Sequence, residues 1–186
     1  IHASRFGEPG DLPQLCVLET WREASREEGT RAREQLRGAV EDALQSLGQG
    51  FVSSPVNQTL RDRFADGSLT PTVYFQQLLR LVYRLIFLLT IEERGVLHVE
   101  GSQSNAVDLY HTGYSLQRLR ELSRRRRAFD RHHDLWQSLK PVFVGLAHGQ
   151  PFLALPALGG LFADDQCPDL DTADLGNAAL LAAVFK

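Results

Sequence analysis

The sequence has no methionine and few cysteines. Its two cysteines, Cys16 and Cys167, are far apart and match neither a zinc-binding nor a redox spacing, which predicts free thiols in an intracellular protein. Wholly apolar runs such as Leu85 to Leu89 are far too short to span a bilayer, and residues 1–15 lack the pattern of a signal peptide. These absences predict a cytoplasmic protein with no membrane partner.

Lysine is almost absent as well. The chain has 20 basic residues, and all except Lys140 and Lys186 are arginine. An arginine-favouring genome explains this bias more simply than selection for bidentate phosphate contacts. The net charge of −3 excludes a general polycation, so any contact with nucleic acid must come from local clustering. With 186 residues, 43% of them apolar, the chain suits a single globular domain, 1–186.

The motifs of common enzyme sites are missing too. The segment "ALGGLF" (157–162) has two glycines, but no predicted strand precedes it and no lysine follows it, so it is no phosphate-binding loop. There is no GxSxG elbow, no glycine-rich methyl-donor pocket and no "NPPY" motif for a flipped adenine. We therefore expect no catalytic residue and no cofactor in this segment.

What the sequence does contain is helical periodicity. Residues 1–24 have the irregular composition of a partly ordered segment, and "SREE" (25–28) has capping-box spacing. A helix is predicted from about Thr30 to Leu47, ended by Gly48 and Gly50. A short helix is predicted near 55–65.

The strongest helical pattern covers residues 71–94. Thr70 is a suitable N-cap, and Pro71 fits the first helical position. Two adjacent apolar stripes predict a helix that is covered on most sides; they are Tyr74, Leu78, Leu81, Leu85 and Leu88, and Phe75, Leu79, Val82, Ile86 and Leu89. Arg80 and Arg84 occupy the remaining face. Pairing with acids of neighbouring helices is the favoured interpretation, and a polar contact at a domain border is the alternative.

Two more helices are predicted after a polar loop at 96–105. One covers 114–127, with its leucines inward and its arginines outward. The other starts near Asp130 as its cap, buries Leu135, Leu139, Val142, Phe143 and Leu146, and is either kinked or relaxed in register at Pro141. The Pro/Gly-rich apolar loop 149–165 should pack on the helices, and Asn177 should cap a final helix. The predicted fold is mainly α, an irregular multi-helix bundle around a central buried helix at about 71–94.

Two groups of residues could suggest a metal site. His132, His133 and Asp134 are adjacent, so their side chains point in different directions on a helix, and a helix start is the favoured interpretation. Five aspartates lack the glycine and the terminal glutamate of a calcium loop, and a solvated turn is favoured; they are Asp164, Asp165, Asp169, Asp171 and Asp174. We predict no metal site.

Arginines cluster around "SRRRRAFDR" (123–131). The candidates for contact with the DNA backbone are Arg118, Arg120, Arg124, Arg125, Arg126, Arg127 and Arg131. Binding to phosphates would relieve the mutual repulsion of such a run, because each neutralised phosphate releases counterions. The alternative is that arginines at a helix C-terminus complement the helix dipole. The residues alone leave the two interpretations nearly even.

Five blocks of the sequence form an ordered set: residues 74–97, 114–120, 134–143, 153–162 and 175–184. Together they resemble the helical region that precedes the catalytic domain in large adenine-specific DNA methyltransferases, with Glu92-Glu93-Arg94 where the family has Glu-Asp-Arg. These enzymes include type IIG restriction–modification enzymes and phage-defence methyltransferases such as PglX of BREX and its DISARM counterpart. The upstream "WREASREEGTRAREQL" (21–36) also fits this region.

The resemblance implies a parent protein that transfers a methyl group from S-adenosylmethionine to adenine in DNA. It implies for this segment the role of a non-catalytic connector that braces the downstream methyltransferase domain and contacts the DNA backbone. The first residue is Ile1 and the apolar segment at 177–186 looks like a helix in progress, so we expect a fragment of a longer chain. The alternative is a protein-interaction module that docks a partner subunit through its apolar loop, without DNA contact.

Overall fold

The computed structural model describes residues 17–185, and side chains from residue 21 onward. Cys16 and most of the predicted irregular segment 1–24 lie outside the described residues. The chain forms two compact units, residues 1–40 and 41–186. Within the described range the structure is mainly helical and has no β-strand beyond one isolated bridge between Gln150 and Leu155. This confirms the predicted fold class.

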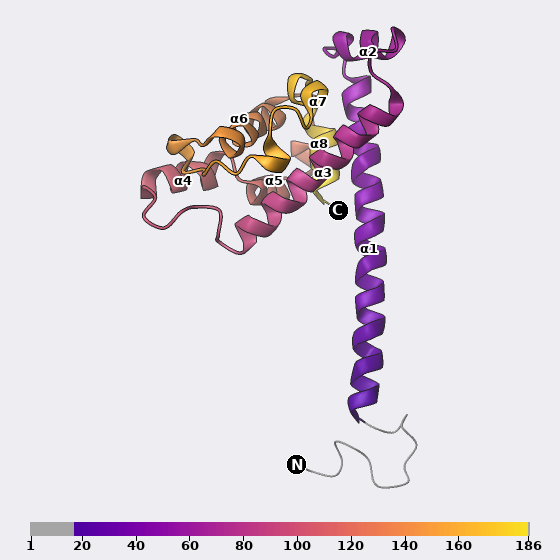
Figure 1. Ribbon diagram of the computed structural model, residues 1–186, viewed down its shortest axis with the longest axis vertical. Helices are drawn as coiled ribbons and strands as arrows, with labels where there is room; N and C mark the ends of the chain where they lie inside the picture. Colours follow the sequence, from indigo (N-terminus) through magenta and orange to yellow (C-terminus); the bar gives the residue numbers. More distant parts are fainter. Residues whose placement is uncertain (1–16, 186) are drawn as a thin grey trace. The chain divides into compact units, whose positions relative to one another are not determined.

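The helices follow one another along the chain (Figure 1). They are α1 (Val17–Ser53), α2 (Gln58–Ala65), α3 (Pro71–Glu93), α4 (Ser104–Gly113), α5 (Leu116–Leu122), α6 (Asp134–His148), α7 (Pro168–Thr172) and α8 (Asn177–Phe185). In the described part of the chain, short 3₁₀ helices connect them: η3 (Arg126–Ala128), η4 (Pro151–Leu153) and η5 (Gly160–Phe162).

Helix α1 is longer at both ends than its predicted range. Its described part runs from Val17 to Ser53, because "SREE" is preceded by the good helix formers "REA" (22–24) and Glu27 pairs with Arg31 one turn later. It also continues through Gly48 and Gly50. A Cβ at Gly50 would lie 2.5 Å from the Cβ of Ala179 in α8, and one at Gly48 would lie 3.1 Å from Leu78 Cδ1 in α3. These glycines permit close helix packing and do not end the helix.

Helix α3 is the central element of the 41–186 unit. Thr70 accepts a hydrogen bond from Val73 N, and Pro71 occupies the first helical position, as predicted. The first predicted stripe is buried throughout: Tyr74, Leu78, Leu81, Leu85 and Leu88. The second stripe is only partly covered, because Phe75 is 52% exposed and only Val82 is fully buried.

By length and apolar composition α3 could also cross a membrane. However, the helix buries Gln77, Arg84 and Glu92 among neighbouring elements. Polar and charged side chains are expensive in a bilayer when they lack partners, whereas here each of the three has protein partners. The helix therefore has the features of a core helix in a globular unit.

The remaining helices pack around α3. The core contains Trp136 and Leu139 of α6 together with Phe51 of α1, whose ring meets the Trp136 ring edge to face at 5.3 Å. The predicted inward face of α6 is buried throughout: Leu135, Leu139, Val142, Phe143 and Leu146. Helix α6 continues through Pro141, because this residue is exposed and the carbonyl that loses its partner can bind water.

Candidate functional site

The arginine run lies in a turn and a 3₁₀ helix, so the predicted helix over 114–127 is too long. Helix α5 ends at Leu122, where the Arg125 amide donates to the Leu122 carbonyl at 2.8 Å. The Ser123 hydroxyl is bonded to the Arg120 carbonyl at 2.7 Å. Four consecutive arginines disfavour further helix because like charges one turn apart repel. The arginines therefore do not complement the dipole from within the last turn of a longer helix.

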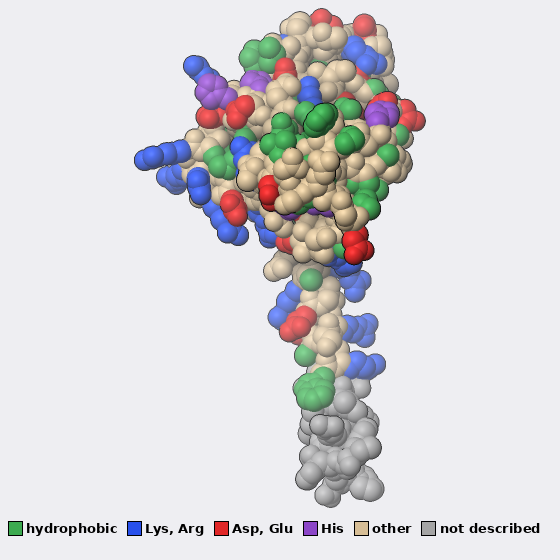
Figure 2. Space-filling view, turned by 90° about the vertical axis from the view of Figure 1, so that its left-hand side faces the viewer, with side chains coloured by type: hydrophobic (Ala, Val, Ile, Leu, Met, Phe, Trp, Pro, Cys, Tyr) green, Lys and Arg blue, Asp and Glu red, His purple; other side chains and the backbone are tan. Residues whose placement is uncertain are grey.

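Five of the seven candidate arginines form an exposed group, the arginine cluster. Its members are Arg124, Arg125, Arg126, Arg127 and Arg131. Among the described residues none of them has an ion pair or a side-chain hydrogen bond. In Figure 2, most of the blue side chains on the large unit gather along the left edge of the face shown. The cluster thus presents several unneutralised positive charges together.

The other two candidate arginines have partners within the fold. Arg118 is half-buried and donates to the Gly113 carbonyl at 3.2 Å. Arg120 forms an exposed ion pair with Glu93 at 2.7 Å. Their positions in the sequence predicted that both would join the cluster. Instead, these contacts fix Arg118 against α4 and Arg120 against α3. They are weaker candidates for binding a ligand.

The segment after the arginine cluster is anchored on α8. Asn177 N donates to the His132 carbonyl at 2.7 Å, and Ala178 N donates to the Asp130 carbonyl at 3.1 Å. The Asn177 side chain donates to Asp130 and Asp134, at 2.8 Å each, and accepts from Leu135 N at 3.2 Å. Asn177 thus caps the start of α6, whereas Asp130, the predicted cap, binds His132 N instead. These bonds hold one end of the arginine-bearing loop in place.

The histidines of this segment are not brought together with other ligands. His132 is exposed, and His133 is the N-cap residue of α6 without a side-chain capping bond. Within residues 17–185, no group of three or more His, Cys, Asp or Glu side chains lies close enough to hold a metal ion. The structure assigns Asp130 and Asp134 to the contact with Asn177.

The other end of the arginine-bearing loop is fixed through α5, which a buried glutamate caps. Glu92 is 6% exposed and accepts hydrogen bonds from Leu116 N and Gln117 N, at 2.8 Å each. It also accepts one from the Tyr110 hydroxyl at 2.5 Å. A carboxylate at a helix N-terminus is favoured by the free amides and by the helix dipole. The Glu-Glu-Arg motif therefore has a structural role: its first residue joins α3, α4 and α5.

Two of the five aspartates after residue 163 are bound more tightly than a solvated turn would be. Asp169 is 6% exposed and bonds with Gln77 and Arg63. Asp171 pairs with the fully buried Arg84 at 2.7 Å. Burial raises the pKa of the Asp171 carboxyl, and the adjacent Arg84 opposes that rise. The prediction of a solvated turn is wrong for these residues, and the preferred pairing of Arg84 with an acid is correct.

Arg84 also holds the Pro/Gly-rich loop, which packs on the helices as predicted. Its guanidinium donates to the Leu161 carbonyl at 2.9 Å and to the Ala163 carbonyl at 3.3 Å. It lies over the rings of Phe143 and Phe162, at 5.2 and 5.8 Å from their centres. The Arg84 contacts do not extend to the first part of the loop, where Phe152 is exposed.

Comparison of the chain with protein-family models, with curated proteins and with solved structures gives no match. Function is therefore inferred from the residues and from the geometry of the arginine cluster.

Proposed function

We propose that this chain is a non-catalytic helical connector of a DNA adenine methyltransferase from a restriction–modification or phage-defence system, and that its arginine cluster contacts the backbone of double-stranded DNA. The observation that carries the DNA contact is the cluster itself. Five exposed arginines lie within eight residues (124–131) and have no acidic partner among the described residues. Exposed guanidinium groups that have no acidic partner bind phosphates, and this binding releases counterions from the DNA.

The anchoring of the loop supports this proposal. The loop that carries the cluster joins α5, capped by Glu92, to α6, capped by Asn177. A loop held at both ends loses less conformational entropy when it binds than a free chain would. The contacts on phosphates would position the duplex without reading its sequence.

The connector role is supported by the way in which the five resembling blocks join one another. Glu92 of the first block caps the helix of the second. Arg84 of the first block binds the Leu161 carbonyl of the fourth, and Asn177 of the fifth caps the helix of the third. The polar residues of the blocks therefore hold the blocks together. A segment that braces a neighbouring catalytic domain would need this internal rigidity. The parent's methyl donor would be S-adenosylmethionine, bound outside this segment, and the proposed site of action is the cytoplasm.

Binding to a fluorescent duplex of random sequence tests the DNA contact. We expect the 186-residue chain to bind at low salt, and the variant with Arg124, Arg125, Arg126 and Arg127 changed to alanine to bind at least tenfold more weakly. The control changes four other exposed arginines, Arg26, Arg31, Arg33 and Arg94, to alanine. Equal loss in both variants would show a general charge effect, and undetectable binding of the unchanged chain would favour the protein-interaction alternative.

The parent's class has a separate test. In the full gene, an Asn-Pro-Pro-Tyr motif is expected downstream of Lys186, and the isolated segment should neither bind S-adenosylmethionine nor methylate DNA. Methyl transfer by the segment alone would contradict the connector role.

A further inference from the structure

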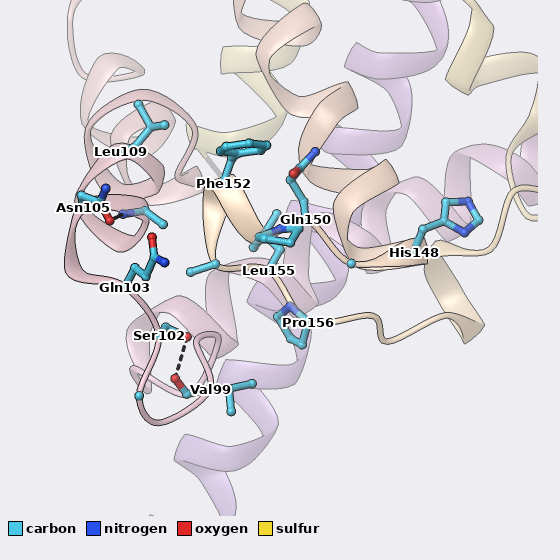
Figure 3. A pocket seen from close by; sticks show the side chains of 15 residues that line it. Val99, Ser102, Gln103, Asn105, Leu109, His148, Gln150, Phe152, Leu155 and Pro156 are labelled. Atoms are coloured by element: carbon cyan, nitrogen blue, oxygen red, sulfur yellow. Dashed lines mark hydrogen bonds between the residues drawn. The ribbon is translucent and has the colours of Figure 1, made fainter.

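An open cleft lies on the 41–186 unit, between the start of α4 and the loop that follows α6. Its volume is about 650 Å³. Residues 99–109 form one wall and residues 148–156 form the other. Figure 3 shows Asn105 and Leu109 on the α4 side, with Phe152, Leu155 and Pro156 on the other. The lining is mostly apolar, with the amides of three side chains at its edge: Gln103, Asn105 and Gln150.

The wall that carries Phe152 is fixed by hydrogen bonds. Gln150 and Leu155 exchange two backbone bonds, of 2.9 and 3.0 Å, across the η4 turn. Ala154 has a φ of +52°, a left-handed conformation that costs a non-glycine residue about 1–2 kcal/mol. Its carbonyl is bonded to His98 Nδ1 at 3.0 Å, which holds this conformation in place. The turn is therefore preformed.

The fixed turn presents an aromatic ring to solvent. Phe152 is 80% exposed, the highest value among the large hydrophobic side chains described, and Val99 and Leu109 in the opposite wall are 62% and 47% exposed. In Figure 2, hydrophobic side chains gather in the middle of the face shown. Rigid exposed aromatic residues beside a cleft are typical of the anchors that dominate binding energy in protein interfaces.

The charge around the cleft selects the kind of partner. The two walls belong to longer stretches of chain, residues 95–117 and 141–185, that contain no lysine and no arginine. They carry exposed acids beside lining residues: Glu100 and Asp108 are their neighbours in the sequence, and Asp164 contacts the lining residue His148 at 3.1 Å. Such a surface repels phosphates, so it is unsuited to the DNA that we assign to the arginine cluster. It attracts a cationic partner instead.

We propose that this cleft docks a peptide segment of a partner protein in which apolar anchor side chains are flanked by lysine or arginine. The anchors would pack between Phe152 and Leu109, which Figure 3 shows. The flanking cations would pair with the exposed carboxylates of Glu100 and Asp108. The inference does not depend on the DNA contact, because the two surfaces use different residues. One molecule would then have two binding surfaces: the arginine cluster for an anionic ligand and the cleft for a cationic peptide.

The test uses two synthetic amphipathic peptides with the same leucine positions, one flanked by lysines and one by glutamates. Binding to the 186-residue chain is measured by fluorescence anisotropy of the labelled peptides. We expect the lysine peptide to bind at least tenfold more tightly than the glutamate peptide, with a difference that shrinks in high salt. Phe152→Ser should weaken the lysine peptide at least tenfold, whereas Phe75→Ser, a change of an equally apolar exposed ring on α3, should not.

Three results would overturn this proposal. The first is equal binding of the two peptides, or equal loss in the Phe75 variant, which would show unspecific adhesion. The second is a concentration-dependent dimer in sedimentation that Phe152→Ser abolishes, because a second copy would then occupy the cleft. The third is weaker binding of duplex DNA by Phe152→Ser, which would assign the cleft to nucleic acid. Phe152 is exposed, so the circular dichroism melting curve of the variant should match that of the unchanged chain.

Discussion

At the scale of the residue, a few buried polar side chains connect segments that are distant in the sequence. Glu92 binds the amides of residues 116 and 117, Arg84 binds carbonyls at 161 and 163, and Asn177 binds residues 130, 134 and 135. A charged group makes stronger hydrogen bonds than a neutral one, and leaving its buried partners unsatisfied costs more. The stability of the fold should therefore be sensitive to these positions.

Glu92→Gln should lower the free energy of unfolding by about 1.5–3 kcal/mol, because an amide oxygen is a weaker acceptor for two helix amides and one hydroxyl. Glu93→Gln is the matched control. Its ion pair with Arg120 is exposed, so it should change stability by less than about 1 kcal/mol. Urea unfolding of both variants checks this prediction. Equal effects would show that Glu92 is not the cap that α5 needs.

Cys167 gives a prediction for pH dependence. Burial raises the pKa of its thiol to about 11, from 9.0 in an accessible thiol. Above pH 9 the unfolded chain would release the thiol proton while the folded chain keeps it, so stability is lost as the pH rises from 9 to 11. Cys167→Ala should lack this component, which amounts to about 2–3 kcal/mol over that interval. Parallel stability curves of the two proteins in urea between pH 8.5 and 11 would contradict the assignment.

At the scale of the element, α3 fixes the segment from residue 161 to residue 171 through polar side chains. Gln77, Arg80 and Arg84 project from it toward residues 161–171. Lysine cannot reproduce the fork of donors by which Arg84 binds two carbonyls and Asp171. The loop should therefore loosen if this one side chain changes.

Arg84→Lys should increase amide hydrogen exchange in η5 and α7 and lower the unfolding free energy by about 2 kcal/mol or more. Exchange in α4 and α5, which Glu92 holds, should change little. Arg80→Lys is the control, since Arg80 makes one bond, to the Gln166 carbonyl at 3.1 Å. If amide exchange increased equally in all helices of the Arg84→Lys variant, Arg84 would support the whole unit and not this segment alone.

Some elements could be predicted from sequence and others could not, for physical reasons. The stripe from Tyr74 to Leu88 and the apolar face of α6 were readable because burial follows helical periodicity over several turns. The passage of α1 through Gly48 and Gly50 was not, since glycine also permits the close approach of α8 and α3. The capping of α6 by Asn177 could not be predicted either, because Asn177 lies 42 positions from Leu135, whose amide it binds.

At the scale of the whole molecule, charge is divided between two surfaces. The arginines of residues 124–131 are exposed together, while the stretches that line the Phe152 cleft carry acids and no lysine or arginine. A net charge of −3 conceals this division. The candidate arginines were found from the sequence as a run, but the cleft was not, because neither Val99 nor Phe152 has a pattern that predicts exposure on a fixed turn.

The salt dependence of DNA binding tests the central claim most directly. The slope of log Kd against log salt concentration measures the number of phosphates that the protein neutralises, at about 0.9 per phosphate for duplex DNA. Changing the four arginines from 124 to 127 to alanine should reduce that slope by about 3–4, whereas the control set of Arg26, Arg31, Arg33 and Arg94 should leave it unchanged. A slope that is the same with and without the four arginines would contradict the account.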